Sequence, residues 1–136
     1  PPPPPPPPPL FFFHAYAGIR DSVASRGLGD VYKRQPLPPR STGALMRQKY
    51  EGLVFPVLRK FEPDLILISA GFDAHKADPL AELNWSTADF SWLTERLCKI
   101  ALECCEGRLV STLEGGYDLE ALADSVKAHV MRLCEA

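Results

Sequence analysis

The chain has 136 residues, which is enough for one domain with a hydrophobic core. Its hydrophobic content of 46%, charged content of 24% and net charge of −2 are ordinary for a globular protein, and they give no electrostatic reason to expect nucleic acid or an anionic membrane surface as a partner. The sequence has no run of about 18 apolar residues, so it predicts no membrane-spanning helix.

Residues 1–35 differ in character from the rest of the chain. Residues 1–9 are all proline, and such a run forms an extended rod that adds nothing to a core. The stretch GIRDSVASRGLGDVYKRQ has neither helical nor strand periodicity and resembles translated sequencing-adapter sequence. We therefore predict a non-native or disordered leader over residues 1–35 and a folded domain over residues 36–136. The alternative is a natural proline-rich linker that recruits a partner domain.

The first periodic segment predicts a helix from Ser41 or Thr42 to about Lys60, with a kink at Pro56. Its apolar side contains Leu45, Leu53, Val54, Val57, Leu58 and Phe61. Residues 65–69 (LILIS) form a continuous apolar run, which is typical of a parallel strand that is covered on both faces. A long loop over residues 70–84 follows.

A second helix is predicted to begin after Ser86 and to end before Gly107, because Ser86 and Asp89 have the spacing of a capping box. Residues 108–113 (RLVSTL) predict a second strand, and Asp118 can cap a last helix. The apolar positions of that last helix include Leu119, Leu122, Val126, Val130 and Leu133. The order helix–strand–helix–strand–helix predicts an α/β fold with both strands parallel in one sheet.

The cysteines and tryptophans of these segments predict burial rather than chemistry. The four cysteines are Cys98, Cys104, Cys105 and Cys134. They form no CxxC pair, so we expect reduced, mostly buried thiols and a cytoplasmic localisation. Trp85 and Trp92 lie seven residues apart, which fits core or interface positions on one helical face.

Two polar segments follow the two predicted strands, at the edge where ligands bind in open α/β sheets. The segment SAGFDAH carries Asp73, whose carboxylate can bind a metal or serve as a turn or cap residue. His75 suggests a ligand pair with Asp73, but a lone histidine is more often a surface or hydrogen-bonded residue. The segment EGGYD carries Tyr117, whose phenol can donate a hydrogen bond to an oxyanion or pack on the next helix.

The segments PDLILISAGFDAHKADPLAELNWSTADF and RLVSTLEGGYDLEALADSV closely resemble the histone deacetylase family, in its bacterial class II-like branch. The resemblance implies the C-terminal part of an arginase-like three-layer α/β/α fold with a parallel sheet. It also implies a Zn²⁺ site, in which Asp73 is one of the ligands and Tyr117 stabilises the tetrahedral oxyanion. In the same way Gly115 and Gly116 match glycines that line the acyl channel, and Leu80 matches a position at the channel's mouth.

The resemblance implies hydrolysis of an acetylated amine, either acetyl-lysine or a small amine such as a polyamine. Leu80 favours an acyl-lysine substrate, because polyamine-selective relatives can carry an acidic residue near that position. The family's Asp-x-His ligands come from an earlier loop, so His75 does not match them. A free-standing, non-catalytic interaction module is the alternative outside enzymes, and the sequence gives no indication of oligomeric state.

The family's tandem catalytic histidines and its Asp-x-His zinc ligands do not occur in this chain, whose only histidines are His14, His75 and His129. A hydrolytic zinc site needs three protein ligands and an activated water. We therefore expect the chain by itself to be inactive. We also expect it to be prone to aggregation, because the sheet would lack neighbours that cover its edges and faces.

Overall fold

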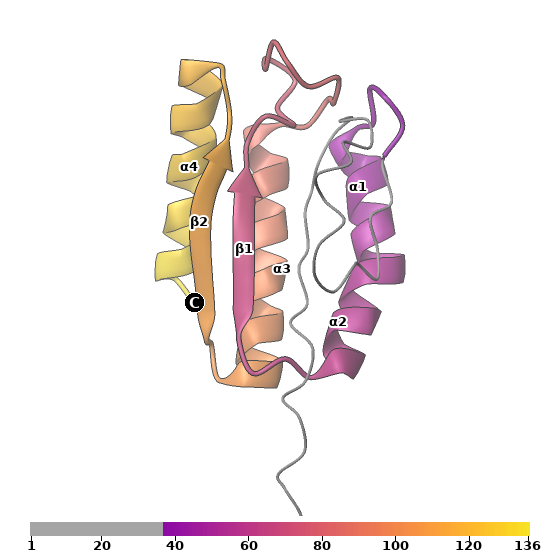
Figure 1. Ribbon diagram of the computed structural model, residues 1–136, viewed down its shortest axis with the longest axis vertical. Coiled ribbons are helices and arrows are strands. Elements are labelled where there is room, and N and C mark those ends of the chain that lie inside the picture. The colour runs from indigo at the N-terminus through magenta and orange to yellow at the C-terminus, as the bar shows by residue number, and fades with distance from the viewer. Residues whose placement is uncertain (1–36) are drawn as a thin grey trace, which may run out of the picture.

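The computed structural model describes residues 37–136, and it confirms the predicted alternation of helices and strands (Figure 1). The predictions for residues 1–35 lie outside the described residues. In chain order the elements are α1 (Gly43–Lys49), a π-helical turn (Tyr50–Val54), α2 (Phe55–Phe61), β1 (Ile66–Gly71), α3 (Thr87–Cys105), β2 (Leu109–Gly115) and α4 (Leu119–Cys134). The strands β1 and β2 are parallel neighbours, with Ile66 paired to Leu109 and Ala70 to Leu113.

The first helix continues past Pro56 with a local change in its hydrogen-bonding pattern. Proline has no N–H to donate, and its ring crowds the carbonyl of the residue four positions earlier. In the structure the π-helical turn over Tyr50–Val54 directly precedes α2, whose first turn contains Pro56. The predicted disturbance is therefore present, as one wider turn. Glu62 ends α2 in the left-handed conformation, with a φ of 51°.

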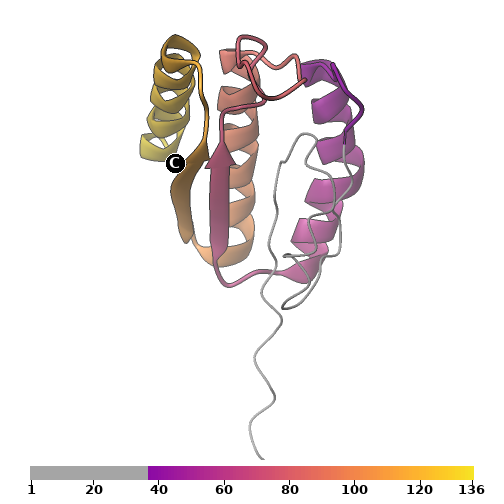
Figure 2. The ribbon, with the colours of Figure 1, turned by 45° about the horizontal axis from the view of Figure 1, so that its top comes forward.

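The two-stranded sheet is covered on one face only within residues 37–136. Figures 1 and 2 show α3 and α4 together behind the strands, with α1 and α2 beside α3. Ile66 and Ala70 point to these helices and are buried, whereas Leu67 is 43% exposed and Val110 is 51% exposed on the opposite face. The expectation that β1 is covered on both faces is wrong for the described residues, because no helix of residues 37–136 lies in front of the strands (Figure 1).

This bare face, defined by Leu67 and Val110, leads to a prediction about association. We expect the 136-residue chain to self-associate, and the double variant Leu67→Thr/Val110→Thr to weaken association by about tenfold or more, since each buried aliphatic side chain contributes about 1.5–3 kcal/mol. Analytical ultracentrifugation over a concentration series measures this. Leu119→Thr is the control, because Leu119 is 80% exposed on α4, away from the bare face. Equal weakening by both variants would contradict the prediction.

The helix α3 begins with the predicted capping box and joins the first helix through the same side chain. Asp89 accepts hydrogen bonds from the Ser86 backbone N–H at 2.8 Å and from the Ser86 hydroxyl at 2.7 Å. Its other oxygen forms an ion pair with the Nη2 atom of Arg47 on α1 at 2.7 Å. The buried carboxylate of Asp89 thus both caps α3 and joins α1 to α3.

The main core lies between the sheet, α3 and the first helix. Its buried residues are Met46, Tyr50, Phe55, Leu58, Ile66, Ala70, Phe72, Ala74, Leu83, Trp85, Phe90, Ile100, Ala101 and Cys105. Trp85 is a core residue as predicted, but it lies before α3 in extended chain that bridges to His75. Trp92 is on α3 and packs at the core boundary, so the two tryptophans do not share a helical face.

The helix α4 buries a stripe that the apolar pattern does not predict. Leu119 and Val130 were expected on its apolar side, but they are 80% and 46% exposed. The predicted Leu122 and Val126 are partly buried and pack against the core. The fully buried positions are Ala121, Ser125 and His129, which recur every four residues on one helical face. Two of these three side chains are polar, and hydrogen bonds to α3 and β2 compensate for their burial.

Candidate active site

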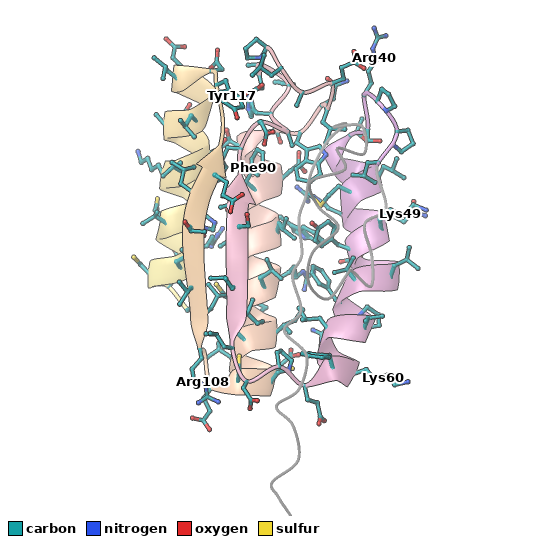
Figure 3. The ribbon with its side chains drawn as sticks, in the orientation of Figure 1. Arg40, Lys49, Lys60, Phe90, Arg108 and Tyr117 are labelled. Atoms are coloured by element: carbon teal, nitrogen blue, oxygen red, sulfur yellow. The ribbon has the colours of Figure 1, made fainter. Side chains whose placement is uncertain are left out.

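The two polar segments singled out in the sequence meet where β1 and β2 end. The Phe72 backbone N–H donates to the Gly115 carbonyl at 2.8 Å, so the segments stay paired beyond the regular ladder. The register shifts between Ala70 and Gly71, which lies opposite Gly115. In Figure 3, Tyr117 is at this end of the molecule and Arg108, just before β2, is at the other. The predicted convergence at the carboxyl edge of the sheet is therefore confirmed.

The carboxylate of Asp73 lies against two glycines, Gly71 and Gly115, which have no side chains to obstruct it. A Cβ atom on Gly71 would be 2.7 Å from the Asp73 Oδ1 atom, and one on Gly115 would be 3.2 Å from it. The two glycines therefore make room for this carboxylate. Partial burial raises the pKa of Asp73, its own backbone N–H opposes that effect, and the negative charge of Asp78 raises the pKa further. The carboxylate is thus short of positive partners, a condition that a bound cation would relieve.

Tyr117 is presented to solvent by the glycine before it. Gly116 has a φ of 135°, and a Cβ atom on it would lie 2.7 Å from the Cδ1 atom of Leu122 and 3.2 Å from the Cβ atom of Phe72. Both the backbone conformation and the space therefore require glycine at this position. Tyr117 is 53% exposed, and its ring is not packed into the start of α4. The geometry leaves the phenol available, as an oxyanion donor must be.

Asp78 is a residue of this region that the sequence analysis missed. Its Oδ2 atom accepts a hydrogen bond from the Tyr117 backbone N–H at 2.8 Å, across 39 positions of sequence. Its Oδ1 atom accepts from the N–H groups of Leu80 at 2.9 Å and Ala81 at 3.3 Å. An Asp-Pro pair signals the local turn, but nothing in the sequence reveals the contact with Tyr117. Leu80 itself is 69% exposed, which suits its expected position at a channel mouth.

His75 is buried and hydrogen-bonded. This agrees with the prediction that a lone histidine is more often a hydrogen-bonded residue than a metal ligand. Its Nδ1 atom accepts a hydrogen bond from the Ala77 N–H at 3.2 Å, and its ring is stacked near Phe90 at a centroid distance of 6.5 Å. The backbone N–H of Trp85 donates to the Ala74 carbonyl at 3.1 Å, so the end of the loop is hydrogen-bonded to its beginning. His75 therefore stiffens the loop that follows Asp73.

A second buried histidine, His129, joins α4 to α3 and β2 beneath the site. The Thr94 hydroxyl donates to the Phe90 carbonyl at 2.8 Å, so it accepts from the His129 Nδ1–H at 2.7 Å. The His129 Nε2 atom is then left to accept from the Ser111 hydroxyl at 2.9 Å. This arrangement satisfies the neutral ring completely, and burial lowers the pKa of His129.

The neutral His129 predicts a stability that depends on pH. Its folded pKa lies below the ordinary value of 6.5, so below that value the unfolded chain takes up a proton that the folded chain does not. The free energy of unfolding should fall as the pH drops below 6.5, by up to about 1.4 kcal/mol per pH unit. Urea unfolding between about pH 5 and 8 measures this dependence.

The control for this prediction is His129→Gln, which keeps polar groups but does not titrate. It should flatten the pH dependence below 6.5. The raised pKa of Asp73 contributes a slope of the opposite sign above its ordinary value of 3.8, and it does so equally in both proteins. An unchanged slope in the glutamine variant would show that His129 is not responsible.

The described residues contain neither a complete metal site nor a membrane-spanning helix. In the described part of the chain, no three histidine, cysteine, aspartate or glutamate side chains are gathered closely enough to hold a metal ion. Within residues 37–136, Asp73 therefore does not belong to a complete set of metal ligands. No helix within residues 37–136 has both the length and the apolar character needed to cross a bilayer.

Residues 11–133 match the family model described as histone deacetylase domain. The chain belongs to the histone deacetylase family. The match begins at residue 11 and so overlaps the leader, whose assignment stays a prediction. Histone deacetylase 14, chloroplastic, of Arabidopsis thaliana is 47% identical over 108 residues, which are 79% of this chain and 25% of that protein. A probable deacetylase of Methanothermobacter thermautotrophicus is 47% identical over 75 residues, which are 54% of this chain and 21% of that protein.

A solved deacetylase structure supports the same assignment at the level of the fold. The crystal structure of the HDA15 HD domain superposes with a TM-score of 0.64 at 31% identity, over 71% of this chain and 27% of that one. The predicted fold class, a deacetylase-like α/β fold with a parallel sheet, is thereby confirmed. The chain spans about a quarter of the length of the Arabidopsis deacetylase that it matches.

Proposed function

We propose that this deacetylase-family chain supplies one side of a zinc-dependent amide-hydrolysing site, over a domain that begins near residue 36. The observation that carries the proposal is the meeting of Asp73 and the Tyr117 segment at the carboxyl edge of the sheet, where Gly71 and Gly115 leave room for the Asp73 carboxylate. A partly buried, poorly compensated carboxylate beside an exposed phenol is an arrangement suited to polarising a carbonyl.

Asp73 fits a zinc ion as a single ligand. Its carboxylate is an anionic oxygen donor of the kind zinc accepts, and burial together with the negative charge of Asp78 raises its pKa. When bound, zinc would supply a Lewis acid and lower the pKa of a water molecule. The remaining ligands and the general base would come from parts of the longer protein that this chain does not contain, so we expect the chain alone to be inactive.

The other residues of the site bind and orient the substrate in this proposal. The Tyr117 hydroxyl donates a hydrogen bond to the acetyl oxygen, and the bond strengthens as negative charge develops there. Gly115 and Gly116 allow the acyl chain to pass close to the backbone. Leu80 presents an exposed aliphatic surface at the mouth. Because that surface is uncharged, we propose acetyl-lysine as the substrate in preference to a cationic acetylpolyamine.

A chimera tests this function. Residues 36–136 would replace the matching segment of histone deacetylase 14 of Arabidopsis thaliana. We expect the chimera to release acetate from an acetyl-lysine peptide, to lose this activity on treatment with a chelator, and to regain it with Zn²⁺. A folded, zinc-loaded chimera without activity, beside an active parent enzyme, would refute the proposal. The 136-residue chain alone should release no acetate.

We propose a cytoplasmic localisation from the state of the cysteines. Cys98 and Cys105 are buried in α3, and burial raises the pKa of the Cys98 thiol. All four thiols, including exposed Cys134, are unpaired with one another. Reduced thiols of this kind are consistent with the cytoplasmic localisation that we propose.

A further inference from the structure

The buried carboxylate of Asp78 connects two residues of the proposed site that lie on different loops. Asp78 is only 8% exposed. One of its oxygens accepts from the Tyr117 N–H at 2.8 Å, and the other accepts from the Leu80 N–H at 2.9 Å. Both contacts are made to backbone, so they fix the chain positions of the residues and leave the side chains of Tyr117 and Leu80 free to meet a substrate.

The Tyr117 segment needs such a restraint. Gly116, the residue before it, has a φ of 135°, a region that glycine adopts more readily than other residues, and it has no side chain of its own to fix the segment. On the other side of Tyr117, the Asp118 side chain caps α4 by accepting from the Ala121 N–H at 2.8 Å. Asp118, after Tyr117, is fixed by its cap of α4, whereas Gly116, before it, has no side chain to fix it. The hydrogen bond from the Tyr117 N–H to Asp78 therefore supplies the second attachment of this segment.

We propose that Asp78 is a positioning residue of the deacetylase site: its carboxylate sets the place of Tyr117 relative to the Leu80 loop. The proposal rests on the proposed function for its catalytic part. Asp78 does not act as a metal ligand, because its two oxygens already accept three backbone N–H bonds. Nor is it only a local turn residue, because its Oδ2 atom reaches the second loop. A shift of about 1 Å in a catalytic group can lower the rate by about 100-fold.

The structural part of the proposal is tested directly in the unaltered 136-residue chain. NMR detects a scalar coupling across a hydrogen bond, here between the Tyr117 amide nitrogen and the Asp78 carboxyl carbon. The Ala121 amide and the Asp118 carboxyl carbon provide an internal reference, because their hydrogen bond has the same length and chemistry. We expect both couplings. A coupling at Ala121 without one at Tyr117 would overturn the positioning role of Asp78. The proposed deacetylase function would not be affected by that result.

A variant pair extends the same test. In Asp78→Asn, amide exchange at Tyr117 should accelerate by about tenfold or more, in keeping with the strength of charge-assisted hydrogen bonds. Exchange in the middle of α3 should change little. Asp124→Asn is the matched control, because Asp124 is an exposed aspartate on α4. Equal acceleration throughout the chain would mean that Asp78 is a general stability residue, contrary to the proposal.

The catalytic part is tested by a double-mutant cycle in the active chimera. We expect Asp78→Asn to lower kcat by about tenfold with a smaller change in KM, since it disturbs a group that acts in the transition state. In a Tyr117→Phe background the same substitution should lower kcat by less than about twofold, because the two effects then share one cause. Additive losses would show that Asp78 does not act through Tyr117. Loss of the Tyr117→Phe effect itself would count against the proposed function instead.

Discussion

Replacing Tyr117 with phenylalanine in the chimera is expected to lower kcat for acetyl-lysine hydrolysis by about 10²–10³-fold, the usual effect of removing one oxyanion donor. The physical reason is that only the hydroxyl is lost, while the ring and the segment that carries it stay in place. Because Tyr117 is more than half exposed, the substitution should leave the stability of the fold unchanged. Steady-state kinetics, together with thermal unfolding, measure both quantities.

Two controls make this result interpretable. Leu119→Ala changes a side chain that is 80% exposed two positions further on, and it should leave kcat unchanged. Zinc content, determined after dialysis, should be the same in the Tyr117→Phe and unaltered chimeras, because the phenol is not a ligand in our proposal. A loss of less than about threefold would mean that Tyr117 does not stabilise an oxyanion.

Gly43→Ala is expected to have the largest effect on stability, about 2–4 kcal/mol. A Cβ atom on Gly43 would overlap the carboxylate of Asp89. Asp89 would have to leave a position in which it caps α3 and binds Arg47, so the substitution would disrupt the junction of two helices at once. Urea unfolding followed by circular dichroism measures the change in the free energy of unfolding.

The chain offers a matched control at Gly52, where an added Cβ atom would meet nothing within 4 Å. Gly52→Ala should stabilise the protein by about 0.5–1 kcal/mol, because alanine restricts the unfolded chain. In the background of Asp89→Ala, where the obstructing carboxylate is gone, Gly43→Ala should cost less than about 1 kcal/mol. An equal cost in both backgrounds would show that the overlap with Asp89 is not the cause.

The parts of the fold that the sequence predicts are those governed by neighbouring residues. The capping box of Ser86 and Asp89 sets the start of α3, and Asp118 sets the start of α4. The apolar run in residues 65–69 identifies β1 because few other structures can bury it. The convergence of Asp73 and Tyr117 was also predictable, since parallel strands place their carboxyl ends at one edge.

The features that escaped prediction depend on contacts between distant residues. Hydrophobic periodicity assigns Leu119 and Val130 to the buried side of α4, but the structure buries Ser125 and His129 instead. Hydrogen bonds with Thr94 and Ser111 compensate for the burial of His129, and no local sequence pattern encodes them. The link from Asp78 to Tyr117 is of the same kind. Uncovered sheet faces were expected from the missing neighbours, but the apolar run in residues 65–69 does not say which face of β1 the helices of residues 37–136 cover.

The unlike surroundings of the two tryptophans give the protein a built-in optical readout. Trp85 is 1% exposed in the loop that follows Asp73, and its indole N–H has no hydrogen-bond partner among the described residues. Trp92 lies close to the guanidinium groups of Arg47 and Arg96, whose central carbons are 5.1 and 5.6 Å from its ring centroid. Fluorescence from Trp85 should therefore report on the loop beside the site, whereas Trp92 should report on the helical junction. Single-tryptophan variants would allow ligand binding and global unfolding to be followed separately in the same protein.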